Sequence, residues 1–214
     1  MNIQKIKKII NEKGLFGLFS KLRYSIKINL FGFWKAIVFQ LDLEKKYPQV
    51  DTGLPLSFRY ASEQDIDSMD DKHYNLDEKS KEYLKERFKE NGKTILAVYN
   101  NKIVGYLCLI LDQMELAPNK FKNLQKNKAY TYKGFVLEEY RGRRIHSAMY
   151  SQLVKFFKKE GKRYVISTVD EDNKPALKTK LKNRADYEII GTLIHIRFFG
   201  LKFDYIPKKY LANV

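Results

Sequence analysis

Three arginines and a glycine directly follow an apolar segment of the chain, and this combination could hold an anion. Arg141, Gly142, Arg143 and Arg144 stand between an expected strand, residues 129–137, and an expected helix that opens near Ile145. The first N–H groups of a helix lack intrahelical partners, and the helix dipole favours negative charge there. Each cation at that end costs about 0.3–1 kcal/mol, so the arginines make sense if a pyrophosphate binds in the turn.

The elements that must position this turn are a strand before it and a long amphipathic helix after it. The helix is predicted over residues 143–160, because its apolar side chains recur at spacings of three and four. They are Ile145, Met149, Leu153, Phe156 and Phe157. Periodicity and turn residues further predict strands at 35–43, 56–60, 94–99, 103–111 and 164–169, a terminal strand pair at 187–203, and helices at 63–69, 77–91 and 173–182. Residues 112–128 are polar, and we expect a loop there that faces substrate or solvent.

The turn resembles the acyl-CoA signature of the GNAT superfamily, the acetyl-CoA-dependent N-acyltransferases, which reads roughly V-x-P-x-Y-R-G-x-G-[IL]-[GA]. The matching positions are Val136, Tyr140, Arg141, Gly142 and Ile145. The departing positions are Glu138 in place of Pro, Arg144 in place of the middle Gly, and His146 in place of Gly or Ala. Because glycine lets the backbone approach the pyrophosphate, the Arg144 departure matters most. Its guanidinium could clamp the phosphates, or the turn could have lost CoA.

Two further matches extend the resemblance over about residues 56–200. Ile103 to Tyr106 is similar to a hairpin motif of the family, and Asn173 to Ala176 is similar to the Asn-x-x-Ala opening of its following helix. The resemblance implies the GNAT α+β fold, with a mixed central sheet, flanking helices and a V-shaped splay between the fourth and fifth strands. The implied domains are a basic extension, residues 1–50, and an acyltransferase domain, residues 51–214.

By resemblance, the pantetheine arm of acetyl-CoA lies between the splayed strands and bonds to backbone, and the turn holds the pyrophosphate. A backbone N–H near Val136 is the implied oxyanion donor, and Asn173 would touch the CoA arm or an ordered water. The expected cofactor-binding residues are Phe135, Val136, Leu137, Arg141, Gly142, Arg143, Arg144, Ile145, His146 and Asn173.

The groups that move protons are less defined by the sequence. The family often places a tyrosine four residues after the alanine of Asn-x-x-Ala, and here that position is Lys180. Tyr187 could take the acid role, and Tyr132, which shares a strand face with Tyr130, could line the acceptor pocket. We name Tyr187 and Tyr132 as catalytic candidates, while ordinary packing explains both equally well.

Other titratable side chains suggest structural roles. Glu138 and Glu139 could serve as a base, or they could pair with the nearby arginines. We expect a structural role for His195, which lies on a terminal strand, and the sequence around His73 indicates no role. Three scattered histidines and one cysteine, Cys108, give no metal-ligand spacing and no internal disulfide, which favours a reducing compartment.

The N-terminal segment has its own composition. Residues 1–50 contain ten Lys or Arg and three Asp or Glu, a net charge of +7, and residues 15–26 carry an apolar helical stripe. Residues 1–34 could rest on an anionic membrane, or could form a basic arm that packs on its own domain or a second subunit. No uncharged run approaches the roughly 20 residues of a membrane span, and no cleavable signal is evident.

The net charge of the chain, +16, implies anionic partners. We expect an N-acetyltransferase that uses acetyl-CoA, without a metal, on an anionic amine-bearing acceptor, such as an amino sugar on a nucleotide or lipid carrier in surface polysaccharide synthesis. The expected location is cytoplasmic, with the option of a peripheral position at the inner membrane face. The alternatives are a GNAT-like CoA- or anion-binding module with weak catalysis and, less favoured, a nucleic-acid binder, for which no recognition motif is present.

Overall fold

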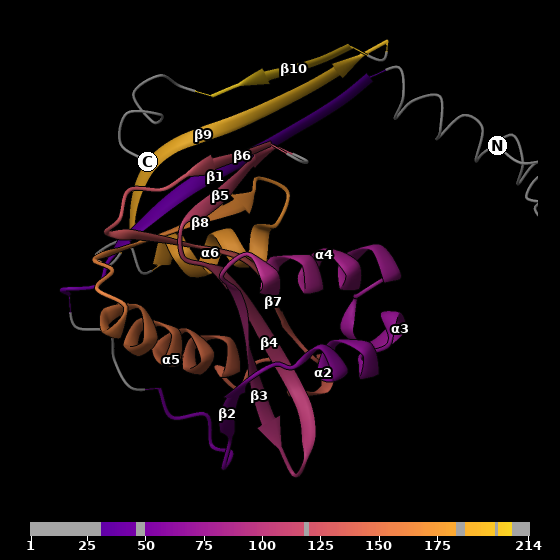
Figure 1. Cartoon of the computed structure of the whole chain (residues 1–214), viewed down its shortest axis with the longest axis vertical. Helices are drawn as coiled ribbons and strands as arrows, with labels where there is room; N and C mark the ends of the chain where they lie inside the picture. Colours follow the sequence, from indigo (N-terminus) through magenta and orange to yellow (C-terminus); the bar gives the residue numbers. More distant parts are fainter. Residues whose placement is uncertain (1–30, 46–49, 118–119, 183–186, 200, 207–214) are drawn as a thin grey trace, which may run out of the picture.

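The computed structural model describes residues 31–45, 50–117, 120–182, 187–199 and 201–206. Its centre is a mixed sheet in the order β10-β9-β1-β8-β7-β4-β3-β2 (Figure 1). These strands are β1 Phe31–Asp42, β2 Ser57–Tyr60, β3 Gly92–Tyr99, β4 Lys102–Ile110, β7 Lys128–Val136, β8 Tyr164–Asp170, β9 Tyr187–Phe198 and β10 Leu201–Tyr205. Neighbouring strands are antiparallel except β7 and β8, which run parallel.

Helices cover both faces of the sheet (Figure 1). They are α2 Glu63–Ser68, α3 Asp71–Tyr74, α4 Glu78–Lys89, α5 Ile145–Lys159 and α6 Lys174–Lys182, with a 3-10 turn η1 at Glu138–Tyr140. Side chains alternate along each strand, so Ile95 and Ala97 pack with α5 while Leu96 packs with α2 and α4 on the other face. The sheet is therefore buried on two sides over β3, β4 and β7.

Local cap and turn residues account for the ends of several elements. Ser62 caps α2 in a reciprocal capping box with Asp65. Asn100 and Asn101 adopt left-handed backbone, with φ of 47° and 61°, as the short turn between β3 and β4 requires. At the end of α4, Asn91 is left-handed, with φ of 62°, and Gly92 already begins β3. The predicted α+β fold with flanking helices is confirmed.

Two segments differ from expectation. The polar segment expected as a loop contains a two-stranded hairpin, β5 Gln113–Ala117 and β6 Lys120–Asn123, which forms a separate small sheet. Met114 and Leu116 point into the core and explain its stability. The strand β1, which lies in the segment assigned to the extension, is an inner strand between β8 and β9. Residues 31–42 are thus part of the sheet, and residues 1–30 of the arm predicted over residues 1–34 lie outside the described residues.

Candidate active site

A gap opens between the parallel strands β7 and β8. They pair only from Lys128–Tyr164 to Thr131–Ser167 and then diverge, which gives the predicted splay. A register shift against β4 inserts an extra residue of β7 between Thr131 and Gly134, and such a bulge bends its strand. The apex of the gap is therefore at Thr131 and Ser167.

The backbone of Val136 faces this gap. Leu137 N–H donates to the Val104 carbonyl at 3.0 Å. Because hydrogen-bonding direction alternates along an antiparallel strand, Phe135 also faces β4, whereas Gly134 and Val136 direct their N–H and carbonyl groups toward the gap. Of the three residues predicted to contact pantetheine through backbone, only Val136 is thus turned toward it. Its N–H can serve as the oxyanion donor that the sequence predicts.

The turn between β7 and α5 retains the backbone of an anion cradle although a glycine is missing. Gly142 has φ of 80°, and Arg144, the N-cap residue of α5, has φ of 57° and ψ of 19°. A non-glycine residue in this conformation costs roughly 1–2 kcal/mol. No side chain of the described residues caps α5, so its first N–H groups remain available to an anion. Ile145 is buried and can contribute only its backbone, while Arg143 and His146 are exposed.

Arg141 is fixed at the mouth of the gap. Its Nε–H donates to the Val136 carbonyl at 3.2 Å, and its guanidinium carbon lies 5.7 Å from the centre of the Phe135 ring. Glu138 is 3.8 Å from Arg141, and Glu139 bonds Lys102 at 2.9 Å. Of the two roles expected for these glutamates, the structure therefore shows ion pairing. The partner of Glu138 is an arginine, as expected, but the partner of Glu139 is a lysine.

His146 reaches from the first turn of α5 to the wall of the gap. Its ring stacks on Tyr150 with centroids 6.1 Å apart, and a Cβ built on Gly134 would lie 2.9 Å from its Nε2. The side chain keeps an exposed edge, but the surrounding protein displaces water and lowers its pKa, and the charge of Lys180 acts in the same direction. A neutral imidazole therefore borders the gap at pH 7, which adds no repulsion to the cationic turn.

Lys180 occupies the apex of the gap on the α5 and α6 side. Its Nζ donates to Ser167 Oγ at 2.8 Å and lies 4.2 Å from the centre of the Tyr187 ring. The rings of Phe39 and Tyr150 enclose it at 5.6 and 5.4 Å. Burial among these groups lowers the pKa of Lys180 to about 7. The sequence singled out this position only as a departure from the family pattern, and its environment depends on β1, α5 and β9 coming together.

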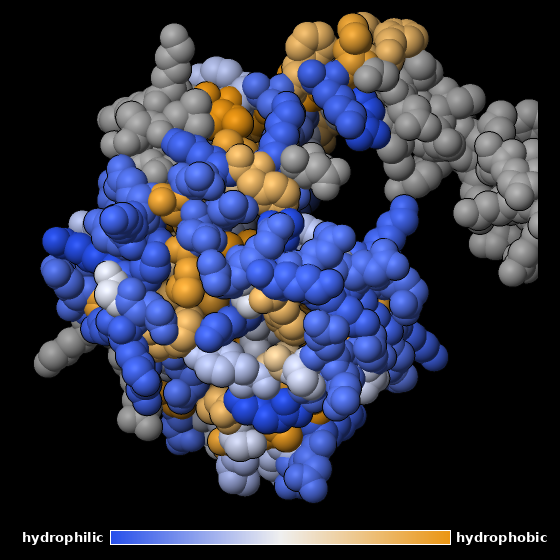
Figure 2. Space-filling model, in the orientation of Figure 1, coloured by the Kyte–Doolittle hydropathy of each residue, from blue (hydrophilic) through white to orange (hydrophobic). Residues whose placement is uncertain are grey.

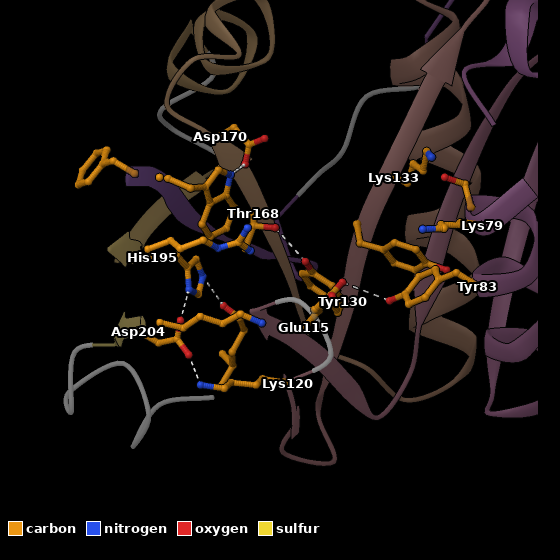
Figure 3. A pocket seen from close by; sticks show the side chains of 18 of the residues that line it. Lys79, Tyr83, Glu115, Lys120, Tyr130, Lys133, Thr168, Asp170, His195 and Asp204 are labelled. Carbon is orange, nitrogen blue, oxygen red and sulfur yellow. Dashed lines mark hydrogen bonds and ion pairs between the residues drawn. The ribbon is translucent and has the colours of Figure 1, made fainter. Parts of the chain in front are cut away.

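A cavity of about 1010 Å³ lies on the opposite face of the sheet (Figure 3). Tyr130 and Thr168 lie where this cavity comes nearest to the apex of the gap. Thr168 follows Ser167 along β8, and the Oγ1 atom of Thr168 lies 2.8 Å from the Oη atom of Tyr130. Tyr83 of α4, Glu115 of β5 and Trp34 of β1 also line it. Alternation along β8 thus puts Ser167 with Lys180 on one face and Thr168 with the cavity on the other.

The acidic side chains of this cavity are already engaged. Asp170 accepts from Trp34 Nε1 at 2.7 Å, and Glu115 accepts from Tyr83 at 3.2 Å. Asp204 accepts from His195 at 2.6 Å and also pairs with Lys120. His195 additionally contacts the Leu116 carbonyl and stacks on Trp34, which agrees with its expected structural role.

Four cations of the cavity have no ion pair or hydrogen bond to a side chain within the described residues. They are Lys79, Lys133, Arg197 and Lys202. Asp77 also lines the cavity: its carboxylate accepts the Ser80 N–H as the cap of α4, and the charges of Lys133 and Lys79 help to lower its pKa. The cavity therefore combines aromatic walls with five Lys or Arg side chains against four carboxylates, and its cations without an ion pair can meet an anionic group of a ligand.

The predicted catalytic tyrosines lie on different faces. Tyr132 lines the cavity, and burial, together with the nearby Cys108, holds its pKa well above 10. It can donate a hydrogen bond but cannot act as a base near pH 7. Tyr187 packs beside Lys180 in the aromatic enclosure. Asn173 accepts the Ala176 N–H at 3.2 Å and so opens α6.

A family model described as the acetyltransferase (GNAT) family matches residues 59–179. The fold is similar to a tandem GNAT protein from the clavulanic acid biosynthesis pathway, with 14% identity over 88% of this chain and 58% of that chain, and a TM-score of 0.56. It is also similar to a GCN5-related N-acetyltransferase from Sphaerobacter thermophilus, with 17% identity over 88% and 57%, and a TM-score of 0.53. The chain thus spans less than two thirds of either protein, and identities this low show a shared fold alone. A sequence search of curated proteins found no match.

Proposed function

The chain belongs to the GNAT acetyltransferase family, and we propose that it transfers the acetyl group of acetyl-CoA to a primary amine on an anionic acceptor. The observation that carries the proposal is the gap between β7 and β8. The basic turn and Lys180 lie on one side of this gap, and Tyr130, Tyr132 and Thr168 of the same two strands line the cavity on the other side. Two substrates that approach from opposite faces could react only through such an opening.

The donor side fits acetyl-CoA. Arg141, Gly142, Arg144 and the free first turn of α5 would hold the pyrophosphate, as charge-assisted hydrogen bonds favour. Gly134 packs so closely against His146 and Leu107 that a methyl group would not fit there, and the His146 ring would border the pantetheine arm. The N–H of Val136 would bond the arm or the thioester oxygen, where negative charge develops during attack.

The reaction requires two proton movements. The amine attacks the thioester carbonyl, a C–N bond forms, the C–S bond breaks, and the amine loses a proton while the thiolate gains one. We assign protonation of the thiolate to Lys180, because it stands at the apex and its pKa of about 7 lets it donate near neutral pH. On the cavity side, we assign removal of the amine proton to Glu115 or Asp170, directly or through water, because their hydrogen-bond donors, Tyr83 and Trp34, are uncharged and leave each carboxylate able to accept a proton.

The acceptor side favours an anionic, ring-containing amine. Lys79, Lys133, Arg197 and Lys202 would pair with phosphate or carboxylate groups, and the aromatic walls would pack on a ring. An amino sugar on a nucleotide or lipid carrier, as used in surface polysaccharide synthesis, has these features.

An acceptor screen tests this function. Purified protein with acetyl-CoA is offered nucleotide-linked amino sugars, the corresponding free amino sugars and polyamines, and release of the CoA thiol is measured. We expect kcat/KM for an anionic acceptor to exceed that for its uncharged counterpart by roughly tenfold or more. Lys133→Gln should reduce this preference without changing acetyl-CoA affinity. Binding of acetyl-CoA without turnover of any amine would favour the alternative, a CoA-binding module in which Lys180 has replaced a catalytic acid.

A further inference from the structure

The end of the sheet formed by β1, β9 and β10 exposes a hydrophobic face. The register aligns Phe33 of β1 with Ile196 of β9, and Ile196 with Phe203 of β10, so these three side chains share one face. Leu201 and Tyr205 lie on the same face of β10, and Phe199 lies in the turn between β9 and β10. We call this set the hairpin face: Phe33, Ile196, Phe199, Leu201, Phe203 and Tyr205.

Hydrophobic exposure in the described part of the chain is concentrated here. Nine large hydrophobic side chains are exposed there. Six of them form the hairpin face, Phe198 adjoins it, and Tyr60 and Ile189 lie elsewhere. Phe199 is 66% exposed, Leu201 60% and Tyr205 59%. Figure 2 shows hydrophobic residues gathered at this end of the molecule. A contiguous patch of this kind marks an interaction surface rather than scattered exposure.

The turn itself is strained in a way that exposes an aromatic ring. Phe199 has φ of 46°, in the left-handed region where asparagine and glycine are preferred. A bulky residue there costs roughly 1–2 kcal/mol. Neither burial nor turn preference accounts for a phenylalanine at this position, so we infer that its exposed ring serves binding.

The sequence segments on either side of the hairpin-face strands are basic. Residues 1–30, which lead directly into β1, contain seven Lys or Arg and one Glu, a net charge of +6. Residues 207–214, which follow β10, contain two Lys and no acidic residue. The first residue of β1 pairs with Phe198, so the basic N-terminal segment joins the sheet beside the face. Aromatic side chains flanked by cations are typical of surfaces that bind anionic lipid.

We propose that the hairpin face docks on an anionic lipid bilayer. Phe199 and Leu201 enter the headgroup region, Phe33, Phe203 and Tyr205 follow, and the basic segments at both chain ends attract the anionic headgroups. The proposal does not depend on the acetyl transfer reaction. It has a consequence for the cavity, since Trp34, His195, Lys202 and Asp204 of the same three strands line it, and Phe33 and Ile196 of the hairpin face border it as well. Docking would place the cavity close to the membrane surface.

A vesicle flotation assay with the full chain tests this surface. The vesicles are either phosphatidylcholine alone or phosphatidylcholine with 30% phosphatidylglycerol. The test variant is Phe199→Ser/Leu201→Ser/Phe203→Ser, whose exposed positions should leave the fold intact. The matched control is Ile189→Ser, because Ile189 is 51% exposed on β9 but lies about 20 Å along the strand from Ile196.

The proposal predicts binding to the anionic vesicles that weakens at 1 M salt, falls at least tenfold in the triple variant, and changes by less than about twofold in the control. A Phe199→Trp variant should show additional fluorescence, beyond that of Trp34, which brominated lipids quench. Equal binding by the wild type and the triple variant would overturn the proposal, because the basic segments alone would then suffice. It is also overturned if the wild type ignores the vesicles and instead forms a dimer that the triple variant dissociates.

Discussion

The Lys180 ammonium donates a hydrogen bond to Ser167 Oγ at 2.8 Å, at the point where β7 and β8 part. Ser167 is the last residue of β8 that pairs with β7, so the ammonium stands at the apex of the gap. Three aromatic rings enclose it, and burial lowers its pKa to about 7. A lysine with its ordinary pKa would hold its proton too tightly to act as an acid at neutral pH.

This position predicts a pH signature in catalysis. An acid must be protonated to donate, so the contribution of Lys180 to kcat should fall about tenfold per pH unit above pH 7. Lys180→Tyr should move this falling limb toward pH 10, the ordinary pKa of tyrosine. Lys180→Arg keeps the charge but cannot release a proton, and should lose roughly 100-fold in kcat. The measurement is kcat against pH at saturating acetyl-CoA. An identical profile for wild type and Lys180→Tyr would remove Lys180 from the reaction.

Stability should respond to the same group. The pKa of Lys180 is about 7 in the folded state and near 10.5 in the unfolded state, so between these values the unfolded chain binds more protons. The free energy of unfolding contributed by this group therefore rises from pH 7 to pH 10.5. Lys180→Met, which has no such titration, should be more stable than wild type by the largest margin below pH 7. Chemical denaturation at pH 6 and pH 9.5 checks this, and an equal margin at both pH values would contradict it.

Arg144→Gly should separate strain from ligand binding. Glycine adopts the φ of 57° found at this position freely, so the variant should gain about 1 kcal/mol in unfolding free energy. If the guanidinium clamps a phosphate, the same variant should bind acetyl-CoA about tenfold more weakly. Asn75→Gly, at another left-handed position with φ of 53°, is the control and should leave affinity unchanged. Unchanged affinity in Arg144→Gly would assign the pyrophosphate to the backbone and Arg141.

Gly134→Ala should obstruct the donor side. The added Cβ would lie 2.9 Å from His146 Nε2 and 3.0 Å from Leu107 Cδ1, so the imidazole, which borders the gap, must shift. We expect acetyl-CoA affinity to fall at least tenfold, with roughly 1–3 kcal/mol lost in stability. The double variant Gly134→Ala/His146→Ala should recover part of the affinity, because the ring that was displaced is gone. No recovery would mean that the methyl group acts through Leu107 and the sheet instead.

The sequence predicts the donor side of the gap better than the acceptor side. The turn around Arg141 is local, with strand, glycine and helix in one stretch, so its position could be predicted. The acceptor cavity is not local, because Trp34 of β1, Tyr83 of α4 and Glu115 of β5 meet only through the sheet order. Composition placed residues 31–42 with the basic segment, yet their alternating apolar side chains insert between β8 and β9. The same insertion brings Phe39 against Lys180. It thereby contributes to the burial that lowers the pKa of Lys180.

Acetyl-CoA binding is the central claim, and isothermal titration calorimetry of wild type, Arg141→Ala and Arg163→Ala tests it most directly. Arg163 is a matched surface arginine that pairs with Asp42 and Glu44, away from the turn. We predict micromolar binding to wild type and Arg163→Ala, and binding about 10- to 150-fold weaker to Arg141→Ala, which loses a charge-assisted contact worth about 1.5–3 kcal/mol. Absence of binding to wild type at millimolar acetyl-CoA, or equal affinity in all three proteins, would contradict the placement of the cofactor in this turn.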